Sequence, residues 1–169
     1  QAARLLIKAH HIYIFAQGNA TALAFLMDRR LRRSGLNTIL LTGQGRDLAE
    51  RLLTITQHDV LLAFAFHTRP PGLALALKRS AATGATSLLI SDSLSLLPSQ
   101  HPTLLLAAPR GEESEFLTLT VPMAICNSLI LTLAQLDKGR SLQVLDDLAH
   151  LISDIECEDE EFTPRESHP

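Results

Sequence analysis

The sequence predicts an α/β fold, a three-layer sandwich in which helices cover both faces of a five-stranded parallel sheet. Short apolar runs alternate with helical patterns along most of the chain, as expected for β-α-β units. The run at residues 60–66 is apolar at nearly every position, which is typical of a central parallel strand that is buried on both faces. The connections are short, so right-handed crossovers in the flavodoxin-like order 2-1-3-4-5 are expected.

The composition fits one globular domain. The chain has 169 residues, of which 46% are hydrophobic, and this excludes a disordered chain. Its net charge of −3 argues against a direct electrostatic interaction of the domain with nucleic acid. Cys126 and Cys157 are the two cysteines, and the histidines are scattered, so we expect no disulfide framework, no metal site and no cofactor.

The location of the protein can also be predicted from composition. No apolar run reaches the ~18 residues of a membrane span, and no signal-peptide pattern opens the chain. The sequence therefore predicts a cytoplasmic protein without membrane contact. The first residue is Gln1 rather than Met, so we expect a fragment of a longer protein or a processed chain.

The segment 11–41 is a strand–loop–helix–strand unit around which the rest of the chain is organised. Strands are expected at residues 12–16 and 38–41, with a helix at residues 20–33 between them. The loop that leaves the carboxyl end of such a strand is where parallel sheets bind ligands. The first N–H groups of the following helix favour an anion there. We therefore expect the ligand to contact Gln17, Gly18, Asn19 and Thr21.

The later elements follow from the same periodicity. Strands are expected at residues 60–66, 86–90 and 103–107, and helices at residues 46–56 and from the prolines at 70 and 71 to residue 83. The helix at residues 116–136 is apolar almost all round, which predicts burial on both sides. In a domain of this size, another subunit could cover one of those sides.

The last helix and the tail complete the predicted domain. Ser141 is a candidate N-cap for a helix whose inner stripe would be Leu145, Leu148, Ile152 and Ile155. From residue 156 the chain is acidic, which predicts a disordered tail over residues 156–169. The domain itself would then occupy residues 1–155.

Several local stretches and the order of the elements resemble the sugar isomerase (SIS) domain, most closely the C-terminal domain of RpiR-type bacterial transcription regulators. The resemblance covers about residues 2–155. It is carried by Ile-Tyr-Ile-Phe-Ala-Gln-Gly-Asn-Ala from Ile12, by His-Asp-Val-Leu-Leu from His58 and by Ile-Ser-Asp-Ser from Ile90. Lys-Arg-Ser-Ala-Ala-Thr-Gly-Ala from Lys78 and Gly-Glu-Glu-Ser from Gly111 add to it.

The resemblance implies a domain that forms a homodimer, or a dimer of dimers, and binds sugar phosphates or other small anionic sugars. In the regulators the sugar phosphate is an effector, and an upstream helix-turn-helix domain, which this chain lacks, contacts DNA. In the isomerases of the family the same fold is catalytic. Glu112 and Glu113 fall where those enzymes carry a catalytic carboxylate.

Two loops depart from the pattern of the family. Where the family commonly has Gly-x-Gly-x-Ser, residues 16–20 read Ala-Gln-Gly-Asn-Ala, with Thr21 as the neighbouring hydroxyl. Where the family commonly has Ser-x-Ser-Gly-x-Thr, residues 65–70 read Ala-Phe-His-Thr-Arg-Pro. An imidazole, one threonine and a guanidinium thus replace hydroxyls that would cradle a phosphate. The guanidinium of Arg69 could pair with a phosphate or a carboxylate through two hydrogen bonds.

These observations predict a ligand site at the carboxyl edge of the sheet, where three loops should converge. Beyond the first loop, its residues would be His67, Thr68, Arg69, Ser91 and Glu113. Structural roles compete with ligand contact at three positions. Asn19 could cap a helix, His67 could be a solvated loop residue, and Glu113 could lie at a solvated helix entry.

Three functions remain open from the sequence. The first is a non-enzymatic, effector-sensing and dimerising domain of an RpiR-type transcription regulator, and this is the function we predict. The second is a phosphosugar isomerase, which would need a placed base and a firmly held sugar. The third is a degenerate SIS domain that is retained for dimerisation alone. We also expect dimerisation through the helical layer that includes residues 120–136.

Overall fold

The computed structural model describes residues 1–93, 101–111 and 116–162, with side chains described as far as Cys157. Five parallel strands form one sheet in the order β2-β1-β3-β4-β5. They are β1 (Ile12–Phe15), β2 (Thr38–Leu41), β3 (Val60–Ala65), β4 (Thr86–Ser91) and β5 (Leu104–Ala107). The predicted fold class and strand order are confirmed, and the strand boundaries agree with the predicted ones to within one residue.

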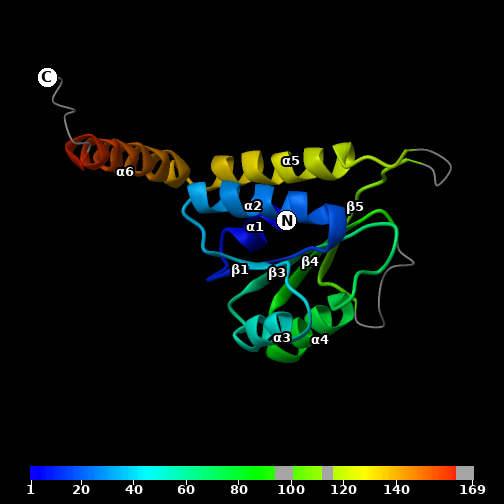
Figure 1. The fold of residues 1–169 in the computed structure, drawn as a ribbon. Helices are drawn as coiled ribbons and strands as arrows, with labels where there is room; N and C mark the ends of the chain where they lie inside the picture. The colour runs from blue at the N-terminus through cyan, green and yellow to red at the C-terminus, as the bar shows by residue number, and fades with distance from the viewer. Residues whose placement is uncertain (94–100, 112–115, 163–169) are drawn as a thin grey trace, which may run out of the picture.

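Helices cover both faces of this sheet (Figure 1). On one face lie α1 (Ala2–Leu6), α2 (Thr21–Arg33) and α5 (Thr120–Leu136), and on the other lie α3 (Gly45–Leu53) and α4 (Leu73–Thr83). Alternate residues of each strand feed the two cores, because successive side chains point to opposite faces. In β1, Ile12 and Ile14 pack into the core under α2 and α5, whereas Tyr13 and Phe15 pack into the core under α3 and α4.

The central strand is β3, between β1 and β4. All six of its residues are buried, as predicted from its apolar composition, because helices cover both of its faces. Its carboxyl end leads into His67, whose φ is 62°. Positive φ is uncommon for a residue with a side chain, so the chain turns sharply where β3 leaves the sheet.

The burial predicted for α5 is only partly correct. Cys126 and Leu133 are buried against the sheet, but Leu131 on the far side is 66% exposed. The described helix also begins at Thr120 rather than at residue 116. One face of α5 is therefore an apolar surface that the described part of the chain leaves uncovered.

The last helix, α6 (Arg140–Phe162), contacts the end of α2 with its first turns and then runs away from the body of the domain (Figure 1). The inner stripe predicted for it is wrong within one chain at three of its four positions, because Leu145, Ile152 and Ile155 are 43%, 46% and 58% exposed. The fourth residue, Leu148, is half-buried. The reason is the turn before it, where Lys138 and Gly139 both have positive φ. This turn bends α6 by 99° from α5.

Two smaller predictions about α6 also differ from the structure. Ser141 lies inside the helix instead of capping it, and its N–H and O–H donate to the carboxylate of Asp137. The helix continues to Phe162, so the first residues beyond 155 are helical rather than the start of a disordered tail. Residues 163–169 lie outside the described residues, and the domain boundary stays a prediction.

Among the described residues, no single helix has both the length and the apolar composition to cross a membrane. Helices α5 and α6 reach that length and apolar composition only when they are counted as one segment, and a sharp bend separates them.

Candidate functional site

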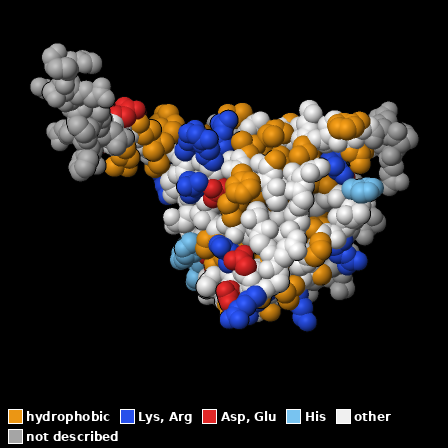
Figure 2. All heavy atoms as spheres, in the orientation of Figure 1, with side chains coloured by type: hydrophobic (Ala, Val, Ile, Leu, Met, Phe, Trp, Pro, Cys, Tyr) orange, Lys and Arg blue, Asp and Glu red, His pale blue; other side chains and the backbone are white. Residues whose placement is uncertain are grey.

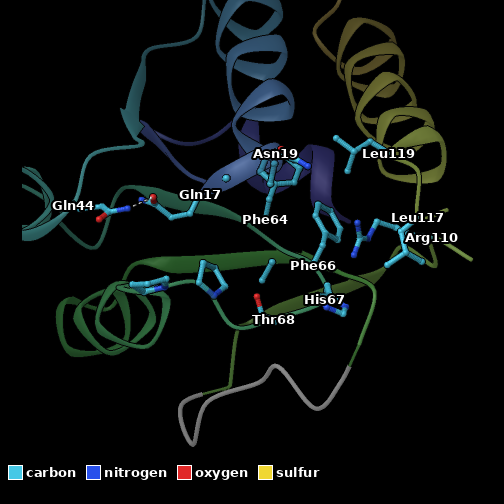
Figure 3. Close-up of a pocket in the computed structure, with 15 residues that line it drawn as sticks. Gln17, Asn19, Gln44, Phe64, Phe66, His67, Thr68, Arg110, Leu117 and Leu119 are labelled. Atoms are coloured by element: carbon cyan, nitrogen blue, oxygen red, sulfur yellow. Dashed lines mark hydrogen bonds between the residues drawn. The ribbon is translucent and has the colours of Figure 1, made fainter. Parts of the chain in front are cut away.

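A cavity of about 540 Å³ lies at the carboxyl edge of the sheet (Figure 3). It is formed by the loops that follow β1, β2, β3 and β5 and by the segment that leads into α5. Its lining combines polar loop residues, an arginine and an apolar wall, and its residues are Gln17, Gly18, Asn19, Ala20, Gln44, Phe64, Ala65, Phe66, His67, Thr68, Pro70, Pro71, Arg110, Leu117 and Leu119. This edge, between neighbouring strands β1 and β3, is the switch point where open α/β sheets bind ligands.

The loop after β1 is held in place by the side chain of Gln17. Its amide Nε2 donates to the carbonyl oxygens of Thr42 and Gly43, at 3.3 and 3.0 Å, and its Oε1 accepts from Gln44 at 3.2 Å. The loop then turns through Gly18, whose φ is 58°, into a short 3-10 helix, η1 (Gly18–Ala20), that continues as α2. Gln17 therefore ties the first loop to the second and orients the start of α2 toward the cavity.

Asp92, just after β4, connects the other loops of the site. Its carboxylate accepts the backbone N–H of His67 at 3.0 and 3.1 Å and the Nε–H of Arg110 at 2.7 Å. The Asp92 and Arg110 side chains are only 13% and 11% exposed, so this is a mostly buried ion pair. One carboxylate thus fixes the loop after β3, with its left-handed His67, against the loop after β5.

Arg110 is also packed against an aromatic ring. Its guanidinium carbon lies 5.1 Å from the centre of the Phe66 ring, within the range of a cation–π interaction. Among the described residues, its Nη2 is buried and has no hydrogen-bond partner. A charged donor in that situation is costly and calls for an explanation.

The structure brings five of the predicted site residues together around the cavity. Gln17, Gly18, Asn19, His67 and Thr68 all line it. The N-cap residues of η1 and α2 are Gln17 and Ala20, so the capping role considered for Asn19 is not observed.

Three other predicted residues that the structure describes do not line the cavity. Thr21 donates its hydroxyl to the Gly18 carbonyl at 2.7 Å, Arg69 is exposed, and the buried Ser91 donates to the carbonyl of Ser93. Glu113 lies outside the described residues. Their contact with a ligand stays a prediction.

Sequence reasoning missed the arginine and the apolar wall of this cavity. Arg110 lies three residues after the end of β5. The wall consists of Phe64, Phe66, Leu117 and Leu119. The position of Arg110 just past a strand was the signal that could have found it, because carboxyl ends of parallel strands share one edge. Its contact with Phe66 and its pairing with Asp92 depend on tertiary packing that no sequence pattern indicates.

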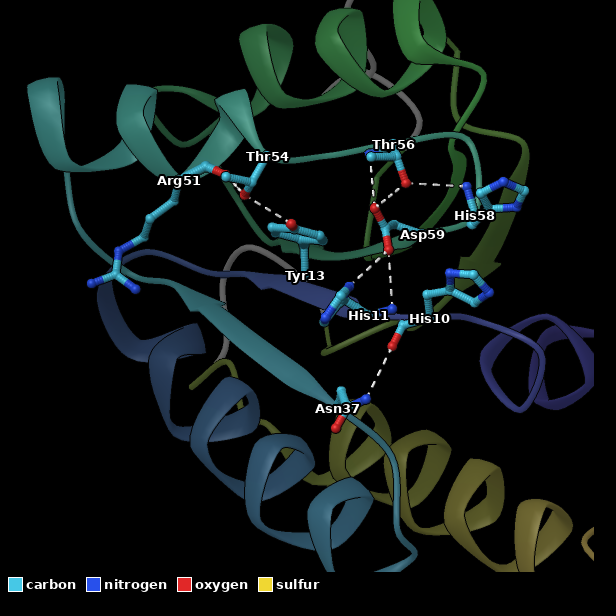
Figure 4. A network of polar contacts seen from close by, with 9 residues as sticks. All are labelled: His10, His11, Tyr13, Asn37, Arg51, Thr54, Thr56, His58 and Asp59. Carbon is cyan, nitrogen blue, oxygen red and sulfur yellow. Dashed lines mark hydrogen bonds and ion pairs between the residues drawn. The ribbon is translucent and has the colours of Figure 1, made fainter.

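A second cavity, of about 850 Å³, lies at the opposite, amino edge of the sheet. It is lined by His10, His11, His58 and the buried Asp59. Figure 4 shows the polar contacts that these residues make. Asp59 is fully engaged, since it accepts hydrogen bonds from His11 and Thr56. No group of three or more described His, Cys, Asp or Glu side chains is arranged to hold a metal ion.

The carboxyl-edge cavity is the better candidate site, although it is the smaller of the two. At the amino edge the central carboxylate is satisfied within the protein, whereas at the carboxyl edge a buried guanidinium nitrogen lacks an acceptor among the described residues. The start of α2, whose amides favour an anion, also faces the carboxyl-edge cavity.

Comparisons with known proteins agree with this fold. The family model of the SIS domain matches residues 5–136. A comparison with curated protein sequences finds no match.

Solved structures give closer geometric relatives. The chain is similar to the sugar isomerase domain of an RpiR transcription factor from Sphaerobacter thermophilus, with 23% identity and a TM-score of 0.80 over 88% of this chain and 83% of that one. It is similar to the Vibrio vulnificus NanR protein complexed with ManNAc-6P, with 15% identity and a TM-score of 0.74, over 91% of this chain but 59% of NanR.

A third similar structure is that of a protein with an inferred enzymatic function. It is a hypothetical protein from Methanococcus jannaschii whose structure infers a 3-hexulose-6-phosphate isomerase function, with 13% identity and a TM-score of 0.65 over 84% of this chain and 80% of that one. At these identities the likeness concerns the fold, and this fold occurs in regulators as well as in isomerases.

Proposed function

Because the chain belongs to the SIS domain family, we propose that it is the effector-sensing domain of an RpiR-type bacterial transcription regulator. Its effector would be a sugar phosphate or a related anionic sugar, bound in the carboxyl-edge cavity. DNA would be contacted by a helix-turn-helix domain outside this chain. A cytoplasmic location belongs to the same proposal.

The observation that carries this proposal is the cavity itself. Its volume of about 540 Å³ suits a small ligand, and it lies at the switch point of the sheet. The polar side chains of Asn19 and Thr68 can hydrogen-bond sugar hydroxyls, while Arg110 supplies a positive charge. NanR, a structural neighbour, has been seen with ManNAc-6P, which supports a sugar phosphate as the first ligand to test.

Calorimetric titration with ManNAc-6P and glucose 6-phosphate tests the proposal. We expect saturable one-site binding by at least one of them. Gln17→Ala should weaken that binding at least tenfold, because it removes the hydrogen bonds that hold the loop after β1 to the loop after β2. Leu53→Ala, an exposed position on the outer face of α3, serves as a control and should bind as the wild type does. Absence of binding across a wide panel of phosphorylated sugars would argue for a domain kept for dimerisation alone.

A phosphosugar isomerase is the alternative. The position of Glu112 and Glu113 after β5 favours it, and His67 at the cavity could assist proton transfer. We nevertheless predict no measurable isomerisation of common sugar phosphates. Ala20, Ala65 and Pro70 stand where the family usually has hydroxyls, so the sugar would be held less firmly than catalysis requires. A turnover that disappears in Glu113→Gln would establish the enzyme instead.

We also propose that the domain forms a homodimer through the layer that contains α5. The exposed Leu131 and Val121 on α5, together with Leu151 and Ile155 on α6, leave apolar surface uncovered. Figure 2 shows apolar side chains along this side of the molecule and basic side chains where α6 leaves the body. Burial of such a surface against a second copy is the simplest way to remove it from water.

A further inference from the structure

We propose that Arg110 is the residue that recognises the anionic group of the ligand, and that Asp92 is its positioning residue. The cavity would then select sugars that carry a phosphate or a carboxylate over neutral sugars. The inference rests on the proposed sugar-binding function. It adds to it the side chain that would bind the anionic group.

The first argument is the way Arg110 is held. Its Nε donates to Asp92 at 2.7 Å and its guanidinium lies over the Phe66 ring at 5.1 Å. These two contacts fix the side chain from one edge and one face, so little conformational freedom remains to be lost when a ligand binds. The fork of the guanidinium can match two oxygens of a phosphate or carboxylate.

The second argument is the unpaired donor. Nη2 is buried and has no acceptor among the described residues, although buried charged donors are normally satisfied. An oxygen of an anion in the adjoining cavity is a suitable acceptor, reached after a small shift of the guanidinium that keeps Nε on Asp92. The cavity already includes Arg110 in its lining, so an anion bound there would lie beside this side chain.

The third argument is the role of Asp92. Without a partner, a guanidinium that is only 11% exposed would be expensive to bury, and the Asp92 carboxylate offsets this cost. The same carboxylate accepts the N–H of His67, which lines the cavity beside Thr68. Asp92 therefore sets the distance between the cation and the polar loop that would contact the sugar.

The rest of the lining fits a ligand with one charged end. Phe64, Phe66, Leu117 and Leu119 form an apolar wall near Arg110, and Asn19 stands near the start of α2 (Figure 3). Apolar surroundings strengthen a charge-assisted hydrogen bond because they lower the local dielectric constant. A neutral sugar could use the polar loop residues, but it would leave Nη2 unpaired.

Binding measurements on single variants test the assignment. Calorimetry would compare glucose 6-phosphate, ManNAc-6P and glucuronate with the neutral sugars glucose and ManNAc. We expect the anionic sugars to bind more tightly, and Arg110→Gln to weaken them about ten- to a hundredfold without weakening a neutral sugar. The comparison of phosphates with glucuronate tells which anion the site prefers. Arg46→Gln, which removes an equally positive but exposed side chain, is the charge control and should bind as the wild type does.

A spectroscopic measurement covers the case in which Arg110→Gln does not fold. In the wild-type protein, the NMR resonance of the Arg110 Nε–H should be sharp and protected from exchange, and addition of glucose 6-phosphate should shift it. Asp92→Asn should remove the protection while the fold, followed by circular dichroism, persists. Arg110→Lys keeps the charge without the fork and should recover only part of the lost affinity.

The outcomes separate the inference from the proposed function. Tight binding of a sugar phosphate that is unchanged in Arg110→Gln, or that is lost in Arg69→Gln instead, would overturn the role of Arg110 and leave the effector-binding function standing. Equal affinity for neutral and phosphorylated sugars would do the same. If no sugar in the panel binds and the Arg110 resonance does not respond, both the function and the inference are contradicted.

Discussion

Asp59 is the residue whose ionisation has the clearest structural consequence. It is 2% exposed and accepts the N–H and Oγ–H of Thr56, both at 2.7 Å, and the N–H of His11 at 3.0 Å, while the Nδ1 of His11 lies 3.2 Å away (Figure 4). Burial acts to raise the pKa of this carboxyl, but the hydrogen bonds from Thr56 and His11 together hold the pKa below its ordinary value of 3.8. The carboxylate therefore fastens the start of β1 to the loop before β3.

The lowered pKa predicts how stability depends on pH. A carboxyl whose pKa is lower in the folded than in the unfolded state stabilises the fold above its unfolded pKa, and this contribution is lost as the pH falls through the folded pKa. We expect the free energy of unfolding to decrease below about pH 4, and Asp59→Asn to reduce that dependence.

At neutral pH the same substitution should lower the free energy of unfolding by about 1–3 kcal/mol, measured by urea denaturation. Asp47→Asn is the matched control. It breaks an ion pair with Arg51 in which both side chains are about half exposed, so its effect should stay below about 1 kcal/mol. Equal losses in the two variants would show that the buried network contributes no more than a surface ion pair.

The residue scale also shows what sequence reasoning could and could not predict about the site. The loops around Gln17 and His67 were predictable because each follows the carboxyl end of a strand. Arg110 was not predicted, although it follows a strand as Arg69 does, and ligand contact by either arginine stays a prediction. Three-dimensional packing distinguishes them, since Arg69 is exposed while Arg110 lies on Phe66 and pairs with Asp92.

At the scale of elements, α5 and α6 each carry one cysteine, and the two thiols should differ strongly in reactivity. Cys126 is buried in α5, and burial raises the pKa of its thiol to about 12, whereas Cys157 on α6 is exposed. Because the thiolate is the reactive form, we expect a thiol-specific disulfide reagent to modify Cys157 rapidly in the native protein and Cys126 only after unfolding in urea. Rapid modification of the Cys157→Ser variant would show that α5 separates from the sheet.

The apolar surface of α5 gives the prediction for dimerisation. Leu131→Glu would place a charge in the proposed subunit interface, so this variant should sediment as a monomer where the wild type sediments as a dimer. Leu53→Glu is the matched control, because Leu53 is similarly exposed, at 69% against 66% for Leu131, but lies on α3 on the opposite face of the sheet. A wild-type protein that stays monomeric at high concentration would contradict the proposed interface.

The same two helices mark the limit of sequence-based prediction for elements. Apolar periodicity predicted that α5 and α6 need cover, and their existence was predictable. The pattern does not say which surface provides the cover. In α6 the left-handed turn at Lys138 and Gly139 directs the helix away from the domain, so most of the stripe predicted to pack inward is exposed within one chain.

At the scale of the whole molecule, the sheet was the most predictable feature. The regular alternation of strands and helices, short links and an apolar third strand leave few arrangements once right-handed crossovers are assumed. The observed order β2-β1-β3-β4-β5 brings the loops after β1 and β3 side by side. Because these two loops are neighbours, the cavity at this edge of the sheet is lined by residues of both loops that the sequence predicted.

The central claim is that an anionic sugar binds at the carboxyl edge of this sheet and not at the amino edge. Backbone amide NMR signals of the protein, followed during titration with ManNAc-6P and glucose 6-phosphate, test it most directly. The account predicts that the signals of Gly18, Asn19, His67 and Arg110 shift together and saturate, while those of His11, Thr56 and Asp59 stay in place. Saturable shifts confined to the amino-edge residues, or no saturable shift at either edge, would contradict it.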